Sequence, residues 1–197
     1  VVEEPNSRFR WLFVEGAAGE SYRPDLEEHR RLAGEWLGRI HDAGMKAVGN
    51  LDLPGRGLDY YFNCVRIGRE RLCRSLHNPA IADSDRGILK AIVGQCDFLE
   101  QKWGQIEDWC AGIPQTFVHG DFSTNNVQIR RTKDGMTLVP FDWVNAGWGI
   151  PVIDFKLPEI DLSAYLSVVG AQMPSLNMKV MPQLLKVRDL FEVVDAI

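Results

Sequence analysis

The sequence lacks the features that mark membrane-spanning, secreted or disulfide-rich proteins. No run of apolar residues approaches the roughly 18 that a membrane-spanning helix needs. Residues 1–10 carry acids and a proline where a secretory signal would have an apolar core. The four cysteines, Cys64, Cys73, Cys96 and Cys110, form no CxxC pair, which disfavours metal and disulfide roles. These absences predict a reduced, cytoplasmic protein with no membrane partner.

Charge of one sign is not concentrated anywhere in the sequence. The chain has 27 acidic and 22 basic residues, and its formal net charge is -5. A protein that follows the phosphates of nucleic acids would need a basic surface, so we expect no nucleic-acid partner and a small cationic or neutral ligand instead. The sequence does not indicate an oligomeric state. With 197 residues, 45% of them hydrophobic, the chain is long enough to bury a core.

The sequence also lacks a phosphate-binding loop of the P-loop type. Its close glycine pairs, Gly16 with Gly19 and Gly55 with Gly57, are not followed by the lysine and the serine or threonine that such a loop requires. A nucleotide would therefore have to be bound by another arrangement.

Helical periodicity is present over most of the chain. Apolar residues recur every three or four positions in segments 25–43, 58–76, 88–110, 162–169 and 181–194, which predicts a helix in each. Gly44 is placed to end the first helix. The apolar stripe from Ile88 to Cys110 is interpreted as core.

The period becomes that of extended chain between residues 116 and 141. Segments 116–118, 127–129 and 137–141 read as strands, and the last two flank a polar turn at 133–135, which predicts a β-hairpin. A further strand is expected at 11–14, leading into a flexible connection. The expected fold class is therefore α+β, mainly helical with a small β-hairpin.

A dense polar cluster lies between two of the predicted strands, from His119 to Asn126. The loop would hold Asp121 and Asn126, and the hairpin would return the chain so that Asp142 lies near them. Phosphoryl transfer needs such a trio: one carboxylate orients and deprotonates a hydroxyl, while an amide oxygen and a second carboxylate hold Mg²⁺ against the nucleotide phosphates. The cluster therefore predicts ATP and Mg²⁺ as cofactors.

Three motifs in this region resemble those of the aminoglycoside phosphotransferases and choline kinases. His119-Gly120-Asp121 followed by Asn126 resembles their catalytic loop, with the spacing H-x-D, four residues, then N. Phe141-Asp142-Trp143 resembles their metal-binding segment, and residues 149–154 are similar to their G-x-P-x-x-D segment. Upstream, 12–16 looks like the hinge strand that grips adenine, and 37–41 looks like the L-x-x-L-H helix.

The resemblance implies a protein-kinase-like fold in which 1–20 is the end of the N-terminal lobe and the hinge, and 21–197 is the C-terminal lobe, with a catalytic core at 115–155. It also implies a role for each matching residue. These roles are catalysis for Asp121; magnesium binding for Asn126 and Asp142; adenine binding at the hinge for Glu15, Gly16 and Ala17; and structural support of the loop for His119 and Asp154.

The sequence departs from the family at its start. Only about ten residues precede the hinge strand, so the N-terminal lobe, with its Gly-rich turn and strand lysine, is largely absent. We expect a fragment of a longer enzyme, or a sequence that omits segments. The function implied is ATP-dependent transfer of the γ-phosphate to a hydroxyl of a small molecule, such as an aminoglycoside-like antibiotic, with antibiotic resistance as the associated role.

One alternative function and the role of two acidic residues remain open, and one further function is disfavoured. The chain could be a non-catalytic nucleotide-binding or pseudokinase-like module. Glu159 and Asp161 could line an acceptor pocket that prefers a cation, or could belong to a solvated loop. A protein kinase is disfavoured because Gly120 replaces the arginine of H-R-D and Trp143 replaces the expected phenylalanine.

Overall fold

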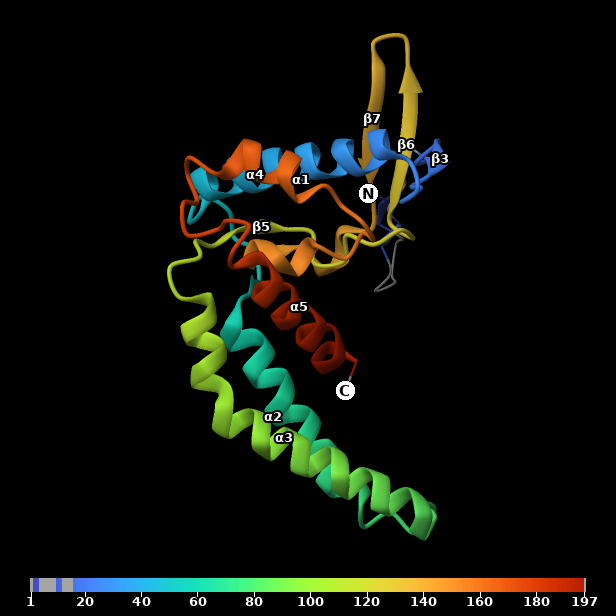
Figure 1. The fold of residues 1–197 in the computed structure, drawn as a ribbon. Coiled ribbons are helices and arrows are strands. Elements are labelled where there is room, and N and C mark those ends of the chain that lie inside the picture. Colours follow the sequence, from blue (N-terminus) through green and yellow to red (C-terminus); the bar gives the residue numbers. More distant parts are fainter. Residues whose placement is uncertain (1, 4–9, 12–15, 197) are drawn as a thin grey trace.

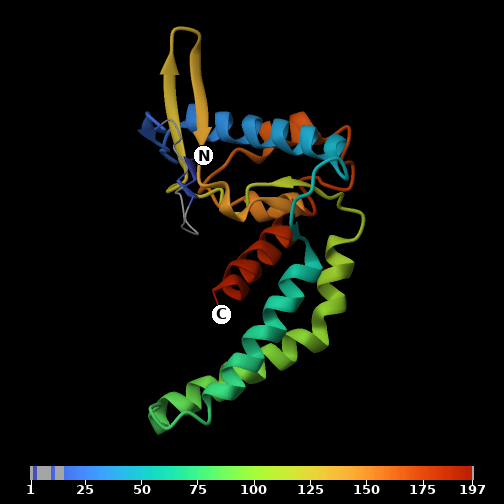
Figure 2. The ribbon, with the colours of Figure 1, turned by 180° about the vertical axis from the view of Figure 1, so that it is seen from behind.

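The structure, a computed structural model, describes residues 2–3, 10–11 and 16–196. Helices α1 (Glu27–Ala47) and α4 (Leu162–Val169) lie side by side, and α5 (Met181–Asp195) lies on the other side of the small sheet that contains β5 (Figure 1). Helices α2 (Leu58–Ser75) and α3 (Asp83–Cys110) pack against each other and extend away from the body as a two-helix arm (Figures 1 and 2).

Short strands form three small sheets within the described residues. The first pairs β1 (Val2–Glu3) with β2 (Arg10–Trp11). The second is antiparallel, in the order β3 (Glu20–Ser21), β6 (Val127–Thr132) and β7 (Gly135–Pro140). The third has the order β4 (Gly55–Arg56), β8 (Gly147–Gly149) and β5 (Thr116–Val118), in which β4 is parallel to β8. The predicted α+β class and the helical lobe with small sheets are confirmed.

The predicted β-hairpin is confirmed as β6–β7, which projects from the body beside α1 (Figure 1). Its register pairs Val127 with Pro140, and the N–H of Phe141 donates to the carbonyl of Asn126 at 3.0 Å. Strand β7 is at the edge of its sheet, where the missing N–H of Pro140 is tolerated. The hairpin therefore brings the end of the polar loop and the start of the Asp142 segment together.

Helix α1 ends later than the sequence predicts. Gly44 does not terminate the helix, which continues to Ala47. A Cβ at Gly44 would lie 2.4 Å from Thr116 Oγ1 and 2.5 Å from the backbone N of Phe117. Gly44 is therefore a packing residue that lets α1 approach β5 closely.

The apolar stripe on α3, which the sequence predicts to be core from Ile88 to Cys110, is buried over only part of its length. Cys96, Trp103, Ile106 and Cys110 are buried, but Ile88 is 62% exposed. The arm extends beyond the body, and the N-terminal part of α3 packs mainly against α2 within the part of the chain that the structure describes (Figure 1). Nearer the body the ring of Tyr61 in α2 stacks on Phe191 in α5 at 3.9 Å and fixes the base of the arm.

None of the helices in the described part of the chain is both long enough and apolar enough to cross a bilayer. The predicted strand at 11–14 lies outside the described residues except for Trp11, which ends β2.

Candidate active site

The polar loop after β5, residues 119–126, is anchored by the aromatic side chain of Phe122. Phe122 is fully buried and stacks on Trp36 of α1, with ring centroids 5.3 Å apart and planes within 9°. Gly120 has φ of 81°, and a Cβ there would lie 2.2 Å from the carbonyl oxygen of Asn145. Only glycine fits that position, both because φ is positive and because the neighbouring backbone is so close.

The buried carboxylate of Asp154, which ends the 3₁₀ turn η2 (Pro151–Asp154), holds the start of the loop. It accepts the backbone N–H of His119 at 2.7 Å and that of Gly120 at 2.8 Å. His41 of α1 lies 3.2 Å from the same carboxylate through Nε2, and 3.0 Å from the Tyr165 hydroxyl through Nδ1. Burial raises the pKa of Tyr165, so its hydroxyl stays protonated and donates to Nδ1, while Nε2–H of His41 donates to Asp154.

His119 is a neutral structural residue in this geometry. The N–H of Asp121 donates to its Nδ1 at 3.3 Å, which leaves Nε2 to carry the proton and donate to the carbonyl of Phe141 at 3.0 Å. Burial lowers the pKa of His119, although nearby carboxylates oppose the shift. The imidazole therefore links the loop to the end of the hairpin.

Asp121 and Asn126 form a fixed pair. Nδ2 of Asn126 donates to Asp121 Oδ2 at 2.7 Å and to the Asp121 carbonyl at 3.0 Å. Asn126 is only 7% exposed, and the two bonds made by its Nδ2 leave its Oδ1 as a free acceptor within the described part. The other oxygen of Asp121 faces Lys156, whose Nζ lies 3.6 Å from Oδ1.

Asp142 lies at the end of the hairpin with an unusual backbone. Its φ of 61° and ψ of 66° are left-handed, and it is one of two non-glycine residues with positive φ in the described chain, the other being Glu159. The side chain is exposed and precedes the 3₁₀ turn η1 (Trp143–Asn145). Phe141, its neighbour, bonds to the Asn126 backbone, so Asp142 and Asn126 are adjacent in space as predicted.

The oxygen donors of Asn126 and Asp142 suit Mg²⁺. One is an amide oxygen and the other a carboxylate, and among the described residues neither is engaged by a basic side chain. In the described chain no group of three or more His, Cys, Asp or Glu side chains could hold a metal alone. Two protein ligands agree with how Mg²⁺ is usually bound, because it keeps waters or phosphate oxygens as its remaining ligands.

A cleft of about 430 Å³ opens beside Asp121. Ser123 and Asn125 of the loop line it, together with Lys156 and, from helix α5, Glu192 and Asp195. The last three residues were not predicted from the sequence. Their only sequence signal is polarity at the edge of apolar patterns, which is also typical of solvated faces.

Glu159 and Asp161, which the sequence suggests could line an acceptor pocket, do not line this cleft. Asp161 caps α4, because its Oδ1 accepts the N–H of Ala164 at 3.0 Å. Besides Asp121, the negative charge around the cleft comes from Glu192 and Asp195 of α5 and not from the loop before α4.

Of the three hinge residues predicted to bind adenine, the structure describes two. Glu15 lies outside the described residues, while Gly16 and Ala17 form coil before β3. Nε of Arg130 in β6 donates to the carbonyl of Ala18 at 3.1 Å, which places this coil beside the hairpin. The adenine-binding role of these residues stays a prediction.

Comparison with known proteins identifies the fold and the family. The ethanolamine kinase of Plasmodium vivax has a similar structure, with a TM-score of 0.56 at 15% identity over 93% of this chain. The match covers 57% of that kinase, so this chain corresponds to little more than half of it. A search of curated proteins gives no match. The model of the phosphotransferase enzyme family matches residues 3–157, which include the whole loop and the Asp142 and Asp154 segments. The chain therefore belongs to the phosphotransferase enzyme family.

Proposed function

We propose that this chain is the acceptor-binding lobe of an ATP-dependent kinase that transfers the γ-phosphate to a hydroxyl of a small molecule. The observation that carries the proposal is the position of Asp121, whose carboxylate is fixed by Asn126 at 2.7 Å and lines an open cleft. A carboxylate held in this way can meet a hydroxyl that enters the cleft. Family membership and the kinase-like fold support this assignment.

The residues of the chain have separate tasks in this proposal. Asp121 orients the acceptor hydroxyl and accepts its proton through the oxygen that faces the cleft. Asn126 fixes the Asp121 carboxylate through Nδ2 and leaves its own Oδ1 to the metal, which Asp142 would also hold. Mg²⁺-ATP, when bound, supplies the phosphoryl group and neutralises its charge. The hinge backbone at 15–17 would bind adenine.

Lys156 is a further candidate for this chemistry. Its Nζ lies 3.6 Å from Asp121 Oδ1, and its side chain is 17% exposed at the edge of the cleft. A cation at that distance attracts the Asp121 carboxylate and is close to the place where negative charge collects during phosphoryl transfer. We assign Lys156 a positioning role beside Asp121.

The proposed acceptor class is an amine-bearing alcohol, which includes aminoglycoside-like antibiotics. Asp121, Glu192 and Asp195 outnumber Lys156 around the cleft, so the site favours a cationic acceptor. Tyr60 donates to Asp195 at 3.1 Å and fixes the orientation of that carboxylate. A solved structure with the same fold is named an ethanolamine kinase, which also acts on an amine-bearing alcohol.

The first test is phosphate transfer by the Asp121→Ala variant. ATP consumption is measured with an aminoglycoside, with ethanolamine and with a neutral sugar as acceptors. We expect turnover to fall by about 10²- to 10⁴-fold, the usual contribution of a general base. The matched control is Asp134→Ala, which removes a carboxylate from the exposed hairpin turn and should leave turnover unchanged. Full turnover in Asp121→Ala would contradict the assignment.

A binding measurement separates this proposal from a non-catalytic nucleotide-binding module. Mg²⁺-ATP at about 100 times its dissociation constant should stabilise the protein by roughly 2.7 kcal/mol, visible as a higher melting temperature. The Asp121→Ala variant should keep this shift, whereas Asp142→Asn should reduce it. Nucleotide binding without transfer to any hydroxylated acceptor would favour the non-catalytic module.

A further inference from the structure

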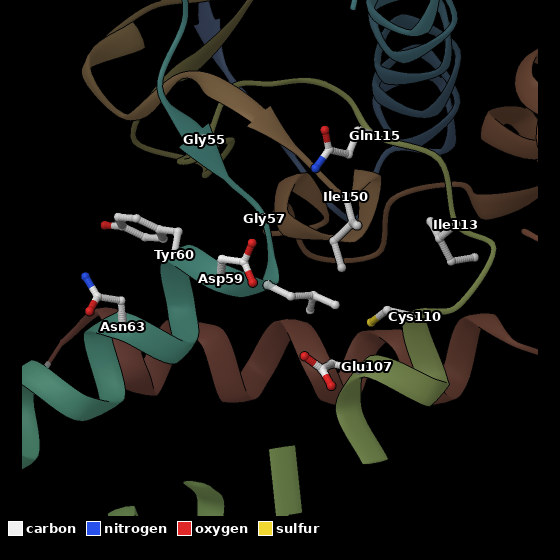
Figure 3. Close-up of a pocket in the computed structure, with 11 residues that line it drawn as sticks. Gly55, Gly57, Asp59, Tyr60, Asn63, Glu107, Cys110, Ile113, Gln115 and Ile150 are labelled. Carbon is white, nitrogen blue, oxygen red and sulfur yellow. The ribbon is translucent and has the colours of Figure 1, made fainter. Parts of the chain in front are cut away.

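A second cavity, of about 630 Å³, lies at the base of the arm, where α2 begins and α3 ends (Figure 3). Its volume is in the range of sites that bind small organic ligands. The residues that line it are different from those of the Asp121 cleft. Tyr60 separates the two, because it lines this cavity while its hydroxyl bonds to Asp195 of the cleft at 3.1 Å.

Both charged side chains that line this cavity are carboxylates. Arg56, between two glycines of the lining, has its guanidinium 4.7 Å from the centre of the Tyr60 ring and offsets part of this charge. Asp59 and Glu107 both line the cavity, and no ion pair among the described residues includes either carboxylate (Figure 3). Asp59 is in the first turn of α2, where the positive helix end offsets it in part. Glu107 is in the last turn of α3, which has no basic residue, so it adds to the negative end of that helix. The Glu107 side of the cavity therefore favours a cation.

The rest of the wall is mixed: Asn63 and Gln115 are polar, but part of it is apolar, which favours an occupant with an apolar body over a bare metal ion. Leu58, Ile113 and Ile150 form the apolar part, together with Cys110, which is 5% exposed. The Cys110 sulfur faces the cavity in Figure 3, and Cys110 is not part of a disulfide. Burial raises the pKa of Cys110 to about 11, so the thiol is neutral. A ligand with an apolar body beside its charge would contact both kinds of wall.

Two glycines keep the cavity open. A Cβ at Gly55 would meet nothing within 4 Å, and one at Gly57 would meet only the Gln115 side chain, at 3.5 Å. Gly57 has φ of -86°, a conformation that other residues adopt without strain. Close packing therefore does not require glycine at either position, and the backbone conformation does not require it at Gly57. A larger side chain at these positions would fill part of the cavity.

We propose that this cavity binds a protonated alkylamine, with the ammonium group beside Glu107 and Asp59 and the alkyl chain against Leu58, Ile113 and Ile150. The site is separate from the acceptor cleft and does not depend on the proposed phosphotransferase activity. It gives the protein a second place at which an organic cation binds, one side chain away from Asp195.

The test is calorimetric titration of the chain with n-hexylammonium, and with 1-hexanol as the uncharged analogue. We expect hexylammonium to bind and hexanol to bind more weakly. Glu107→Gln should weaken hexylammonium by about fivefold, the upper range for one partly exposed ion pair. Gly57→Leu should abolish binding by filling the cavity. Melting temperatures establish that each variant is folded, and the Glu107→Gln result decides the outcome if Gly57→Leu does not fold.

Two control variants locate the bound amine. Asp134→Asn removes a carboxylate from the distant hairpin turn and should leave the affinity for hexylammonium unchanged. Glu192→Gln removes one from the Asp121 cleft and should weaken hexylammonium less than Glu107→Gln does. A loss of affinity in Glu192→Gln with none in Glu107→Gln would place the amine in the acceptor cleft and overturn the proposal. Equal affinity for hexanol, or no binding of hexylammonium at millimolar concentration, would also overturn it.

Discussion

Asp154 is the residue on which the conformation of loop 119–126 depends, because its carboxylate accepts the N–H groups of His119 and Gly120. In Asp154→Ala both buried donors would lose their partner, and each unsatisfied donor costs about 1–3 kcal/mol. We expect the free energy of unfolding to fall by about 3 kcal/mol or more, measured by urea denaturation. Asp134→Ala, at an exposed turn, should change it by less than about 0.5 kcal/mol. A similar small effect in Asp154→Ala would show that the loop does not need this carboxylate.

The buried His119 predicts a dependence of stability on pH. Its pKa in the folded protein is lowered by burial from the ordinary value of 6.5. As the pH falls below about 6.5, the unfolded chain therefore binds the proton first, and the free energy of unfolding decreases. His119→Gln keeps an N–H donor for Phe141 but cannot titrate. Melting temperatures at pH 7.5 and 5.5 should differ less in this variant than in the wild type, and an equal difference would assign the pH effect to other groups.

The loop residues of the site are predictable from the sequence, but the residues that face them across the cleft are not. Asp121 and Asn126 are five positions apart in one segment, so a short motif identifies both. Lys156 is two residues after Asp154, which the family resemblance places beside the loop, but no pattern shows that its side chain faces the cleft. Asp195 reaches the cleft from α5, and nothing in the sequence places that helix next to the loop. Whether a polar side chain on α5 faces water or a cleft is decided by tertiary packing, which one sequence does not display.

At the level of elements, glycines divide into those that permit packing and those that do not. A Cβ at Gly44 of α1 would lie 2.4 Å from Thr116, whereas one at Gly104 of α3 would meet nothing within 4 Å. We expect Gly44→Ala to lower the free energy of unfolding by about 1–3 kcal/mol through overpacking. Gly104→Ala, the matched control, should raise it by about 0.4–1 kcal/mol because alanine favours the helix. Chemical denaturation measures both, and equal effects would contradict the close approach of α1 to β5.

Length and residue type together decide how well the sequence predicts an element. The five α-helices and the β6–β7 hairpin have enough residues for a period to be visible. Strand β5 has only three residues, but all three, Thr116 to Val118, are strand-forming types. Strands β3, β4 and β8 are as short or shorter and consist mostly of residues that do not favour strands, so no pattern could reveal them. Their pairing depends on neighbours distant in sequence, such as Gly55 beside Trp148. The end of α1 was placed too early because a packing glycine and a terminating glycine look the same in sequence.

At the level of the whole molecule, the arm is the part with the least support from the body. Its outer end includes Ile88, which is 62% exposed, while Leu37 of α1 is fully buried. We expect the amides of residues 70–90 to exchange with deuterium at least about tenfold faster than those of residues 33–41, because local opening there disrupts few buried contacts. Mass spectrometry of proteolytic peptides measures this difference. Equal protection in both segments would show that the arm and the body open as one unit.

The left-handed backbone of Asp142 lowers the stability of the fold at a residue whose carboxylate the proposed chemistry needs. An L-residue with φ of 61° carries a conformational cost that glycine would not. Glycine at position 142 would relieve that cost but remove the carboxylate proposed to hold the metal. A laboratory evolution experiment that rewards thermal resistance alone should therefore tend to lose this carboxylate, while one that also rewards phosphate transfer should retain it.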